Sequence, residues 1–208
     1  LQYIAEFLDK IKTNDGTYIP VILRPYHEHN HTWAWWGANS CSIDEYNALW
    51  RMTVEYLRDE SNLHHILYAI SPQDISSADE YLSRYPGDEW VDIFGMDSYS
   101  LWNLAAITNL GEALSIVNEL AYERGKVVAL TEVGIENVPI ANWWTDYLLE
   151  AIKYNEFSRK TVWALVWRNH NTEHHFAPYP GHASATNFIE FFNDPFTVFL
   201  GNLNQIYP

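Results

Sequence analysis

Apolar residues gather in five short runs along this chain of 208 residues, and polar stretches separate the runs. Several runs are apolar at nearly every position, whereas a strand with one wet face would alternate between apolar and polar residues. Continuous runs of this kind are typical of parallel strands that are covered on both faces. The runs, each predicted to be a strand, span about residues 19–24, 64–70, 91–96, 126–131 and 161–167.

Between these runs the apolar residues recur at helical spacing. Residues 1–11 are apolar at positions 1, 4, 7, 8 and 11, and the pattern ends at an Asn-Asp-Gly turn. Ser42 and Glu45 have the spacing of a capping box, which opens an amphipathic stretch to about residue 59. Residues 103–123 and 139–154 show similar periodicity. The sequence therefore alternates predicted strands with predicted helices.

This alternation indicates an α/β protein, and the strand spacing favours one architecture. Successive runs begin roughly 27 to 45 residues apart, which brackets the ~31 residues per unit of a (β/α)8 TIM barrel. An open Rossmann-like sheet is the alternative, but no glycine-rich phosphate turn follows any run. The first helix also begins without a capping residue. We therefore expect residues 1–208 to form one partial catalytic barrel, N-terminally truncated, with strands four to eight present and the first three βα units missing.

Composition narrows the classes of partner. Hydrophobic residues make up 48% and charged residues 19% of the chain, as in a soluble globular protein with a sizeable core. Twelve Lys and Arg against 27 Asp and Glu give a formal charge of -15, which disfavours nucleic acid and anionic membranes. No apolar run reaches the ~18 residues of a membrane span. The only cysteine, Cys41, excludes an intrachain disulfide. A neutral polysaccharide remains a compatible partner.

Two glutamates carry the candidate chemistry. Glu28 and Glu132 each follow a predicted strand, and hydrolysis of a glycosidic bond needs two carboxyl groups that face each other. Either glutamate alone indicates little, because acidic residues also follow strands merely to meet solvent or to cap a helix. The chain holds 10 Trp and 14 Tyr, however, and Trp33, Trp35 and Trp36 lie close to Glu28. Flat rings suit the faces of sugars, so the combination indicates a glycosidase.

The segment around Glu28 resembles the acid/base segment of glycoside hydrolase family 26, whose best-known members are endo-β-1,4-mannanases. It reads Arg-Pro-Tyr-His-Glu-His-Asn-His-Thr-Trp-Ala-Trp-Trp-Gly over residues 24–37. Related barrel glycosidases usually have Asn before this glutamate, whereas this family has His, as at His27. Four further segments resemble the family in the family's order, namely residues 95–99, 130–134, 166–169 and 178–182.

The resemblance implies a reaction and its setting. Glu28 would be the general acid/base on strand four and Glu132 the nucleophile on strand seven, with retained anomeric configuration and carboxyl groups about 5 to 5.5 Å apart. The expected substrates are β-1,4-mannan, glucomannan or galactomannan, although the family also has xylan-active and mixed-linkage-glucan-active members. No metal or other cofactor is expected. The resemblance further implies a bacterial-type monomer that is secreted, periplasmic or bound to the cell surface.

The resemblance also assigns residues around the two glutamates. Tyr99 is expected to donate a hydrogen bond to Glu132, and Trp167 to form the floor beneath the cleaved sugar; each is otherwise an ordinary packing residue. Arg24 and Arg168 are expected to support the site, although a plain structural ion pair also explains Arg24. The residues expected to bind substrate are His27, Trp33, Trp36, Asp97, Tyr99 and Trp167.

One triplet departs from the family pattern. Many relatives have Met-Asn-Gly or a similar small-residue turn after the acid/base glutamate, where this chain has His29, Asn30 and His31. Two interpretations of the histidines stay open. His29 and His31 either contact sugar in the leaving-group subsites or simply shape the loop.

Two other functions fit parts of the sequence. Residues 27–31 satisfy the H-E-x-x-H signature of zinc proteases, which works only on a helix, where both imidazoles share one face. Here the motif follows an apolar run and Pro25, and bulky residues come after it, so a helix is disfavoured. The second alternative is a non-catalytic carbohydrate-binding fragment or pseudoenzyme. A five-stranded fragment would expose two sheet edges, and we expect it to be weak or inactive alone.

Overall fold

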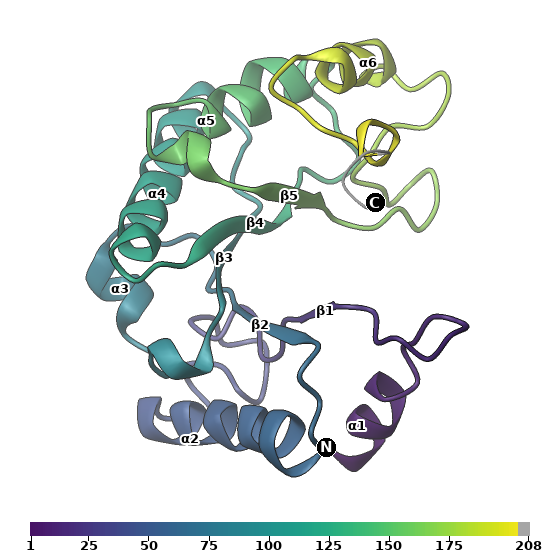
Figure 1. Ribbon diagram of the computed structural model, residues 1–208. Coiled ribbons are helices and arrows are strands. Elements are labelled where there is room, and N and C mark those ends of the chain that lie inside the picture. Colours follow the sequence, from purple (N-terminus) through teal and green to yellow (C-terminus); the bar gives the residue numbers. More distant parts are fainter. Residues whose placement is uncertain (204–208) are drawn as a thin grey trace.

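The computed structural model describes residues 1–203, and its centre is one sheet of five parallel strands (Figure 1). Along the sheet the strands keep their order in the chain, and every neighbouring pair is parallel. A Rossmann-like sheet would reverse its order at a switch point, and the described sheet has no reversal. The predicted arc of a βα barrel is therefore confirmed. Its strands are β1 (Val21–Leu23), β2 (Ile66–Ile70), β3 (Ile93–Ser98), β4 (Val127–Val133) and β5 (Trp163–Val166).

Helices connect the strands and cover the outer side of the arc (Figure 1). Two of them adjoin a π-helical segment: Glu55–Glu60 continues α2 (Ile43–Val54), and Trp144–Leu149 leads into α5 (Glu150–Ile152). Short 3₁₀ segments lie at Asp88–Trp90, Ser158–Lys160 and Leu200–Asn202. The α-helices are α1 (Gln2–Leu8), α2 (Ile43–Val54), α3 (Ala78–Leu82), α4 (Leu104–Glu123), α5 (Glu150–Ile152) and α6 (Ala185–Asn193).

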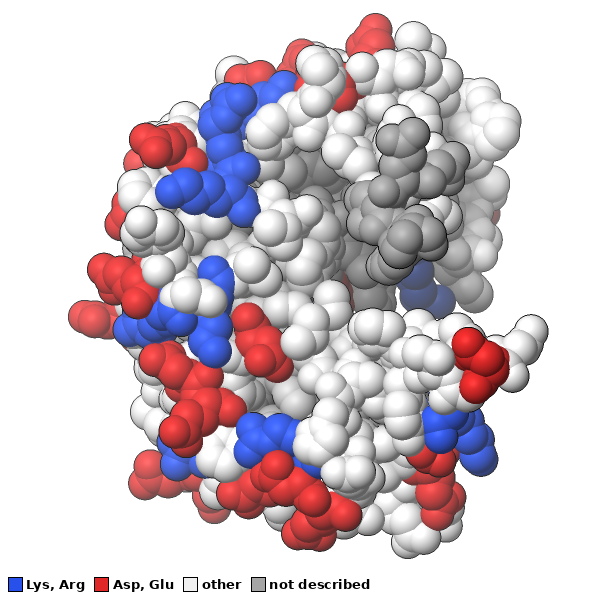
Figure 2. Space-filling view, in the orientation of Figure 1, with Lys and Arg blue, Asp and Glu red and all other residues white. Residues whose placement is uncertain are grey.

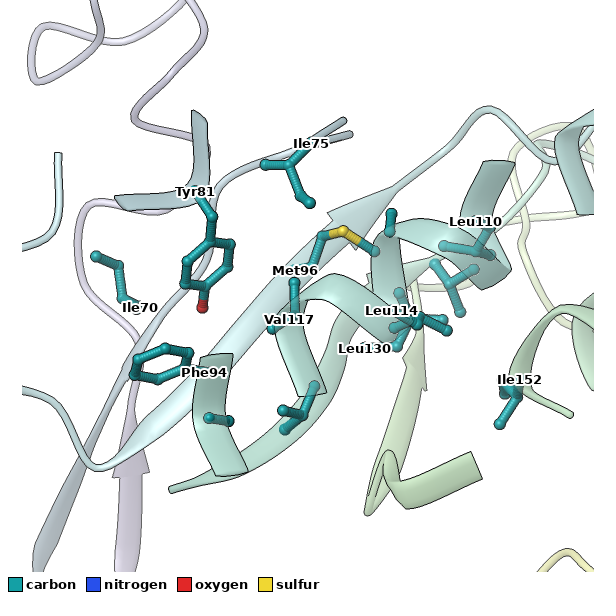
Figure 3. Close-up of a cluster of buried hydrophobic side chains, with 14 of the residues drawn as sticks. Ile70, Ile75, Tyr81, Phe94, Met96, Leu110, Leu114, Val117, Leu130 and Ile152 are labelled. Atoms are coloured by element: carbon teal, nitrogen blue, oxygen red, sulfur yellow. The ribbon is translucent and has the colours of Figure 1, made fainter. Parts of the chain in front are cut away.

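The main hydrophobic core lies between the sheet and α4. Met96 of β3 and Leu130 of β4 belong to one buried cluster with Leu110, Leu114 and Val117 of α4 (Figure 3). Full burial of a side chain of this size contributes roughly 1.5–3 kcal/mol. The apolar positions predicted within residues 103–123 therefore form the packing face of α4. This packing holds β3 and β4 in place.

All five predicted strands are present, but their boundaries differ from those predicted. β1 has only three residues, because Pro20 and Pro25 flank it and neither has an amide hydrogen for the sheet. β3 and β4 run two residues beyond their predicted ends, so Asp97 and Glu132 lie inside strands. Their polarity does not end the strands, because protein donors bind both carboxylates.

The helix predictions were confirmed in part. The Ser42 hydroxyl accepts from the N–H of Glu45 and the Glu45 carboxylate accepts from the N–H of Ser42, so the capping box is present. The predicted start at residue 139 is wrong. Asn137 and Val138 have left-handed backbone (φ 61° and 38°), and the helical segment begins only at Trp144. The sequence did not predict α3 or α6.

The two end strands and the surface agree with the sequence analysis. β1 and β5 each pair with one strand among the described residues, and Ile22 and Leu165 are 47% and 46% exposed there. Two open sheet edges were predicted.

Within residues 1–203, no helix is both long enough and apolar enough to cross a bilayer. Figure 2 shows acidic and basic side chains mixed over the helical side, with few at the centre of this face.

Candidate active site

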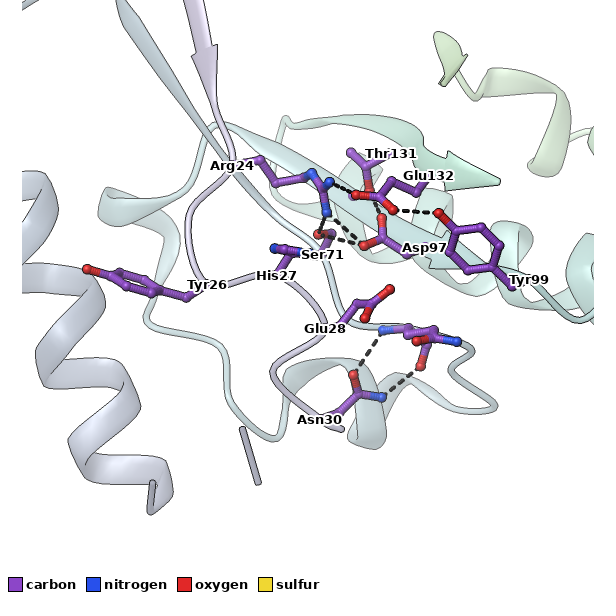
Figure 4. Close-up of polar contacts among 12 residues, drawn as sticks. Arg24, Tyr26, His27, Glu28, Asn30, Ser71, Asp97, Tyr99, Thr131 and Glu132 are labelled. Carbon is purple, nitrogen blue, oxygen red and sulfur yellow. Dashed lines mark hydrogen bonds and ion pairs between the residues drawn. The ribbon is translucent and has the colours of Figure 1, made fainter. Parts of the chain in front are cut away.

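Polar and charged side chains meet where β1, β3 and β4 end (Figure 4). Arg24 directly follows β1, Asp97 lies near the end of β3, and Glu132 lies near the end of β4. The carboxyl ends of parallel strands share one edge of the barrel, which is where such folds build active sites. Asp97 and Glu132 are buried, with 0% and 3% of their surfaces exposed. Two carboxyl groups in this position need compensating donors.

A β-bulge in β4 brings Glu132 beside Asp97. The preceding residues of β3 and β4 pair one to one, but Asp97 pairs with Glu132, which leaves Thr131 as an extra residue. Bulges re-aim the side chains that follow them. The Thr131 hydroxyl donates to Asp97 Oδ1 at 2.6 Å. Gly95 makes room for this arrangement, because a Cβ atom there would lie 2.7 Å from the Thr131 side chain.

Arg24 links the two buried carboxylates. Its Nη1 donates to Asp97 Oδ2 at 2.7 Å and to Ser71 Oγ at 2.9 Å, and its Nη2 donates to Glu132 Oε1. Burial raises the pKa of Asp97 to about 7, although Arg24 and Thr131 lower it. Asp97 therefore holds a proton more readily than an exposed carboxyl group. The Arg24 guanidinium compensates negative charge at Glu132, and the predicted location of Arg24 beside the carboxylates is confirmed.

Tyr99 binds the other oxygen of Glu132. Its hydroxyl donates to Glu132 Oε2 at 2.6 Å, as predicted. The Tyr99 ring packs edge-on against Phe176, with ring centroids 5.8 Å apart. Burial and the bond to Glu132 raise the pKa of Tyr99 above its ordinary value, so the phenol keeps its proton and remains a donor. Both oxygens of Glu132 thus accept hydrogen bonds from protein donors.

Glu28 lies in the loop between β1 and α2. Its backbone is left-handed (φ 53°), and its N–H donates to the carbonyl of Ser71 at 2.7 Å. Its carboxylate accepts from Trp33 Nε1 at 2.6 Å. Burial raises the pKa of Glu28, the Trp33 donor lowers it, and the charge of Glu132 raises it. The net direction is upward, which suits a proton donor.

The carboxyl groups of Glu28, Asp97 and Glu132 share one space. One oxygen from each lies within 4.8 Å of the others. Retaining glycosidases hold their carboxyl pair about 5–5.5 Å apart and inverting enzymes about 6.5–9.5 Å apart. The side chains of Glu28 and Glu132 therefore meet, as the sequence analysis expected, while their catalytic roles stay a prediction. Three carboxylates at this spacing would also suit a cation, and Arg24 supplies a positive charge to two of them.

The tryptophans after Glu28 have different environments. Trp33 is 55% exposed and donates to Glu28, so its indole touches both the Glu28 carboxylate and solvent. Trp36 donates its Nε1 to the carbonyl of His27 at 2.8 Å and packs edge-on against Trp33 and Trp35. Trp36 therefore holds the loop, and its substrate contact stays a prediction. The His27 ring lies 5.4 Å from that of Trp33, and burial lowers the pKa of His27.

Trp167 and Arg168 are not part of the hydrogen-bond network within residues 1–203. Trp167 directly follows β5, and its N–H donates to the carbonyl of Val133 at 3.2 Å. This bond places its backbone next to the end of β4. The Trp167 indole is partly buried, and its role as a sugar platform stays a prediction. Arg168 is exposed, and none of its described contacts reaches Glu28 or Glu132.

The zinc-protease hypothesis is wrong about its required helix. Residues 27–31 form turns, because Glu28 is left-handed and Pro25 precedes it. His27 and His31 therefore do not share a helix face. His29 is 1% exposed, packs 4.6 Å from the ring of Tyr46 and shapes the loop from inside. Its buried position excludes a direct sugar contact, whereas His31 is exposed.

Some residues of the site escaped the sequence analysis. Ser71 directly follows β2. Its position at a strand end, which also singled out Glu28 and Glu132, could have identified it from the sequence. Thr131 precedes the nucleophile candidate, but nothing local indicates a bulge. Trp102 is 51% exposed and donates its Nε1 to the carbonyl of Tyr99 at 2.9 Å, which fixes an additional indole beside the site.

Solved structures and curated proteins are similar to this chain. A family 26 β-mannanase structure from Bacteroides ovatus is 40% identical with a TM-score of 0.92, and the match covers 100% of this chain and 60% of that one. A mannan endo-1,4-beta-mannosidase from Bacillus subtilis is 32% identical over 175 residues, or 81% of this chain and 44% of that protein. A protein of the same name from Bifidobacterium adolescentis is 43% identical over 145 residues, or 64% of this chain and 14% of that protein.

The chain thus spans 60% or less of the length of each of these relatives. The family model described as glycosyl hydrolase family 26 matches residues 1–199, which is nearly the whole chain. The fold and the facing glutamates agree with this match. The chain belongs to glycosyl hydrolase family 26.

Proposed function

We propose that this chain forms the catalytic part of a retaining endo-β-1,4-mannanase. The observation that carries the proposal is the pair of carboxyl groups of Glu28 and Glu132, with oxygens within 4.8 Å of each other. The two groups have different surroundings, as a retaining pair requires. Donors bind both oxygens of Glu132, whereas partial burial raises the pKa of Glu28.

In the first step, Glu132 attacks the anomeric carbon of the sugar while Glu28 protonates the departing glycosidic oxygen. The bond between carbon and leaving oxygen breaks, and an ester between the sugar and Glu132 forms. In the second step, Glu28 takes a proton from water, the water oxygen attacks the same carbon, and the ester breaks. Two inversions give net retention. The proton returns to Glu28, so the site is restored after each turnover.

The surrounding residues suit these steps. Arg24 and Tyr99 hold Glu132 in place with two donors, and this restricts its direction of attack. Asp97 is 0% exposed and accepts hydrogen bonds from Arg24 and Thr131, so we assign it to orienting these neighbours and not to contact with a sugar hydroxyl. We assign His27, Trp33 and Trp167 to sugar binding. Trp33 has the best support for this role, because its exposed ring touches the proton donor.

Mannan, glucomannan and galactomannan are the proposed substrates, because mannan is the substrate in the names of the relatives described above. Xylan and mixed-linkage glucan are the alternatives within the family. Since such polymers do not enter cells, we place the enzyme outside the cytoplasm. We further propose that it acts as a monomer without a cofactor, and that catalysis needs the remaining three units of an eight-unit barrel.

The test is reducing-sugar release from a panel of mannan, galactomannan, xylan and mixed-linkage glucan. It compares the 208-residue chain with a version extended by about 100 residues, the length of three barrel units. We expect the extended version to cleave mannans, and proton NMR to show a β-configured first product. An α-configured first product would contradict the retaining mechanism. Equal activity of both versions would refute the need for three further units.

The same panel separates the enzyme from a carbohydrate-binding module. A module would bind mannan, for instance in affinity electrophoresis, without releasing reducing ends. The presence of both glutamates, with carboxyl oxygens within 4.8 Å of each other, favours the enzyme. Binding without release by the extended version would favour the module.

A further inference from the structure

The side chain of Asn30 holds the loop of Glu28 against the segment after β2. Its Nδ2 donates to the carbonyl of Gln73 at 2.7 Å, and its Oδ1 accepts from the N–H of Gln73 at 2.9 Å. Figure 4 shows this pair of bonds close to Glu28. Only Asn and Gln have side chains that carry both an amide donor and a carbonyl acceptor. Together with the bond from the Glu28 N–H to the Ser71 carbonyl, the pair ties the loop of Glu28 to the segment after β2.

The segment after β2 is bonded in turn to the end of β3. The N–H of Asp74 donates to the carbonyl of Asp97 at 3.0 Å. The Asp74 Oδ1 atom accepts from the hydroxyls of Ser98 at 2.6 Å and of Ser100 at 3.2 Å. These two serines flank Tyr99 in the chain. The contacts therefore run from the loop of one glutamate to the tyrosine that binds the other.

Two residues along this route have left-handed backbone. Glu28 has φ 53° and Asp74 has φ 45°, a conformation that is unfavourable for residues other than glycine. Such conformations persist where the surrounding contacts hold them in place, and they gather at functional sites. The paired bonds of Asn30 lie two residues after Glu28 and one residue before Asp74. They are therefore placed to hold both.

We propose that Asn30 is a positioning residue, and that through Gln73 and Asp74 it fixes the distance between the two carboxyl groups. The inference rests on the proposed function, because it takes Glu28 as the acid/base and Glu132 as the nucleophile. Asn30 acts through Glu28 and contacts no reacting atom. Glu28 lies in a loop, so no sheet ladder holds its backbone. The two bonds between Asn30 and Gln73 supply an attachment in its place.

The first test is Asn30→Ala in the extended, active version of the chain. We expect kcat on mannan to fall about 10²-fold, the scale of a misplacement of about 1 Å, with KM nearly unchanged. The loss shrinks for an aryl mannoside with a good leaving group, because its departure needs no proton. Asn39→Ala is the matched control, since Asn39 is exposed in the same loop and has no side-chain hydrogen bond among residues 1–203. It should leave both activities unchanged.

A second readout separates positioning from general destabilisation. In Asn30→Ala the loosened loop exposes the carboxyl group, so the pKa of Glu28 falls toward its ordinary value in an NMR titration. A purely structural role would lower the melting temperature and leave this titration unmoved. The titration also needs no turnover. Lack of mannan cleavage by the unmutated enzyme therefore counts against the proposed function, while the titration still decides the role of Asn30.

A third variant serves if Asn30→Ala fails to fold. In Asn30→Asp the new side chain donates to the Gln73 carbonyl only when it is protonated. Activity relative to the unmutated enzyme should therefore recover as the pH is lowered. The proposal is overturned by a pH-independent ratio, or by an Asn30→Ala variant whose Glu28 titration and leaving-group dependence match those of the unmutated enzyme.

Discussion

The two facing glutamates lie in regions that are built in opposite ways. Glu132 lies inside β4, is 3% exposed, and has donors on both carboxylate oxygens. Glu28 lies in a loop and has left-handed backbone, and among residues 1–203 its carboxylate has one side-chain hydrogen-bond partner, Trp33. The first region is a regular strand with a bulge, and the second is held mostly by contacts to other loops.

This difference distributes the proposed roles. Hydrogen bonds and a cation favour the charged form of a carboxyl group, whereas partial burial with few donors favours the neutral form. Glu132 therefore has the surroundings of an anion that attacks, and Glu28 those of an acid that gives up a proton. The position of the donors, more than the glutamates themselves, decides which residue does which step. The following variants test that division.

The largest effect is expected from Glu132→Ala. The variant removes the attacking atom, so kcat/KM should fall by about 10⁴-fold or more, the scale seen when a nucleophile is removed. Polysaccharide and activated aryl mannoside should lose activity equally, because both need the covalent step. Steady-state kinetics on the two substrates measure this. Glu119→Ala, at an exposed carboxylate on α4, is the control and should behave like the unmutated enzyme.

Glu28→Ala should give a smaller and substrate-dependent loss. Removal of a general acid costs typically 10²–10⁴-fold, so we expect a loss of about that size on mannan. Formation of the covalent intermediate from an aryl mannoside with a good leaving group should be largely spared. Pre-steady-state release of the aryl group measures that step separately. Equal losses on both substrates would remove the acid role from Glu28 and with it the contrast between the two regions.

Trp33→Phe should change the pH profile. The indole N–H lowers the pKa of Glu28 by binding its charged form, so its removal raises that pKa further. An acid must be protonated to act, and the basic limb of kcat/KM should therefore move to higher pH. Trp35→Phe is the matched control, because Trp35 lies in the same loop without contact to Glu28. A basic limb that stays in place in Trp33→Phe would contradict the assignment of this limb to Glu28.

His29→Met tests the stability of the acid/base loop. His29 is 1% exposed, and neither ring nitrogen has a hydrogen-bond partner among residues 1–203. Met has no such polar group and packs adaptably. Because a buried unsatisfied group costs about 1–3 kcal/mol, we expect the free energy of unfolding to rise by about that amount at pH 7. Urea denaturation measures it, with the exposed His31→Met as a control that should change little.

The same variant should flatten the dependence of stability on pH. Burial lowers the pKa of His29 to about 3, with a smaller contribution from Arg84, against 6.5 ordinarily. As the pH falls below about 6.5, the unfolded chain takes up a proton that the folded chain refuses. The folded state therefore loses about 1 kcal/mol per pH unit down to about pH 3. An identical pH dependence in His29→Met would contradict this origin.

Much of the site was predictable because its chemistry is carried by residues at strand ends. Glu28, Glu132, Arg24, Tyr99 and Asp97 were predicted as neighbours, and the structure brings all five together. The prediction of a helix from residue 139 failed because the helical spacing continues back through residues 139–142, which are irregular or form turns. Period alone does not report backbone conformation.

Other features depend on contacts between distant parts of the chain. The bulge at Thr131 requires the missing side chain of Gly95 on the neighbouring strand, and no local pattern shows it. The two bonds between Asn30 and Gln73 join residues 43 positions apart. Asn and Gln are polar residues that suit any exposed loop, so their presence in the sequence does not indicate these bonds.

The sequence by itself determined the alternation of strands and helices and the types of residue at each strand end, because both follow from local periodicity and side-chain chemistry. Only the tertiary structure decided how the charges are shared. Arg24 and Glu132 are 108 positions apart, and their ion pair exists because parallel strands bring their carboxyl ends to one edge. Burial and donor placement, which set the protonation of Glu28 and Asp97, are properties of that assembled edge and of no segment alone.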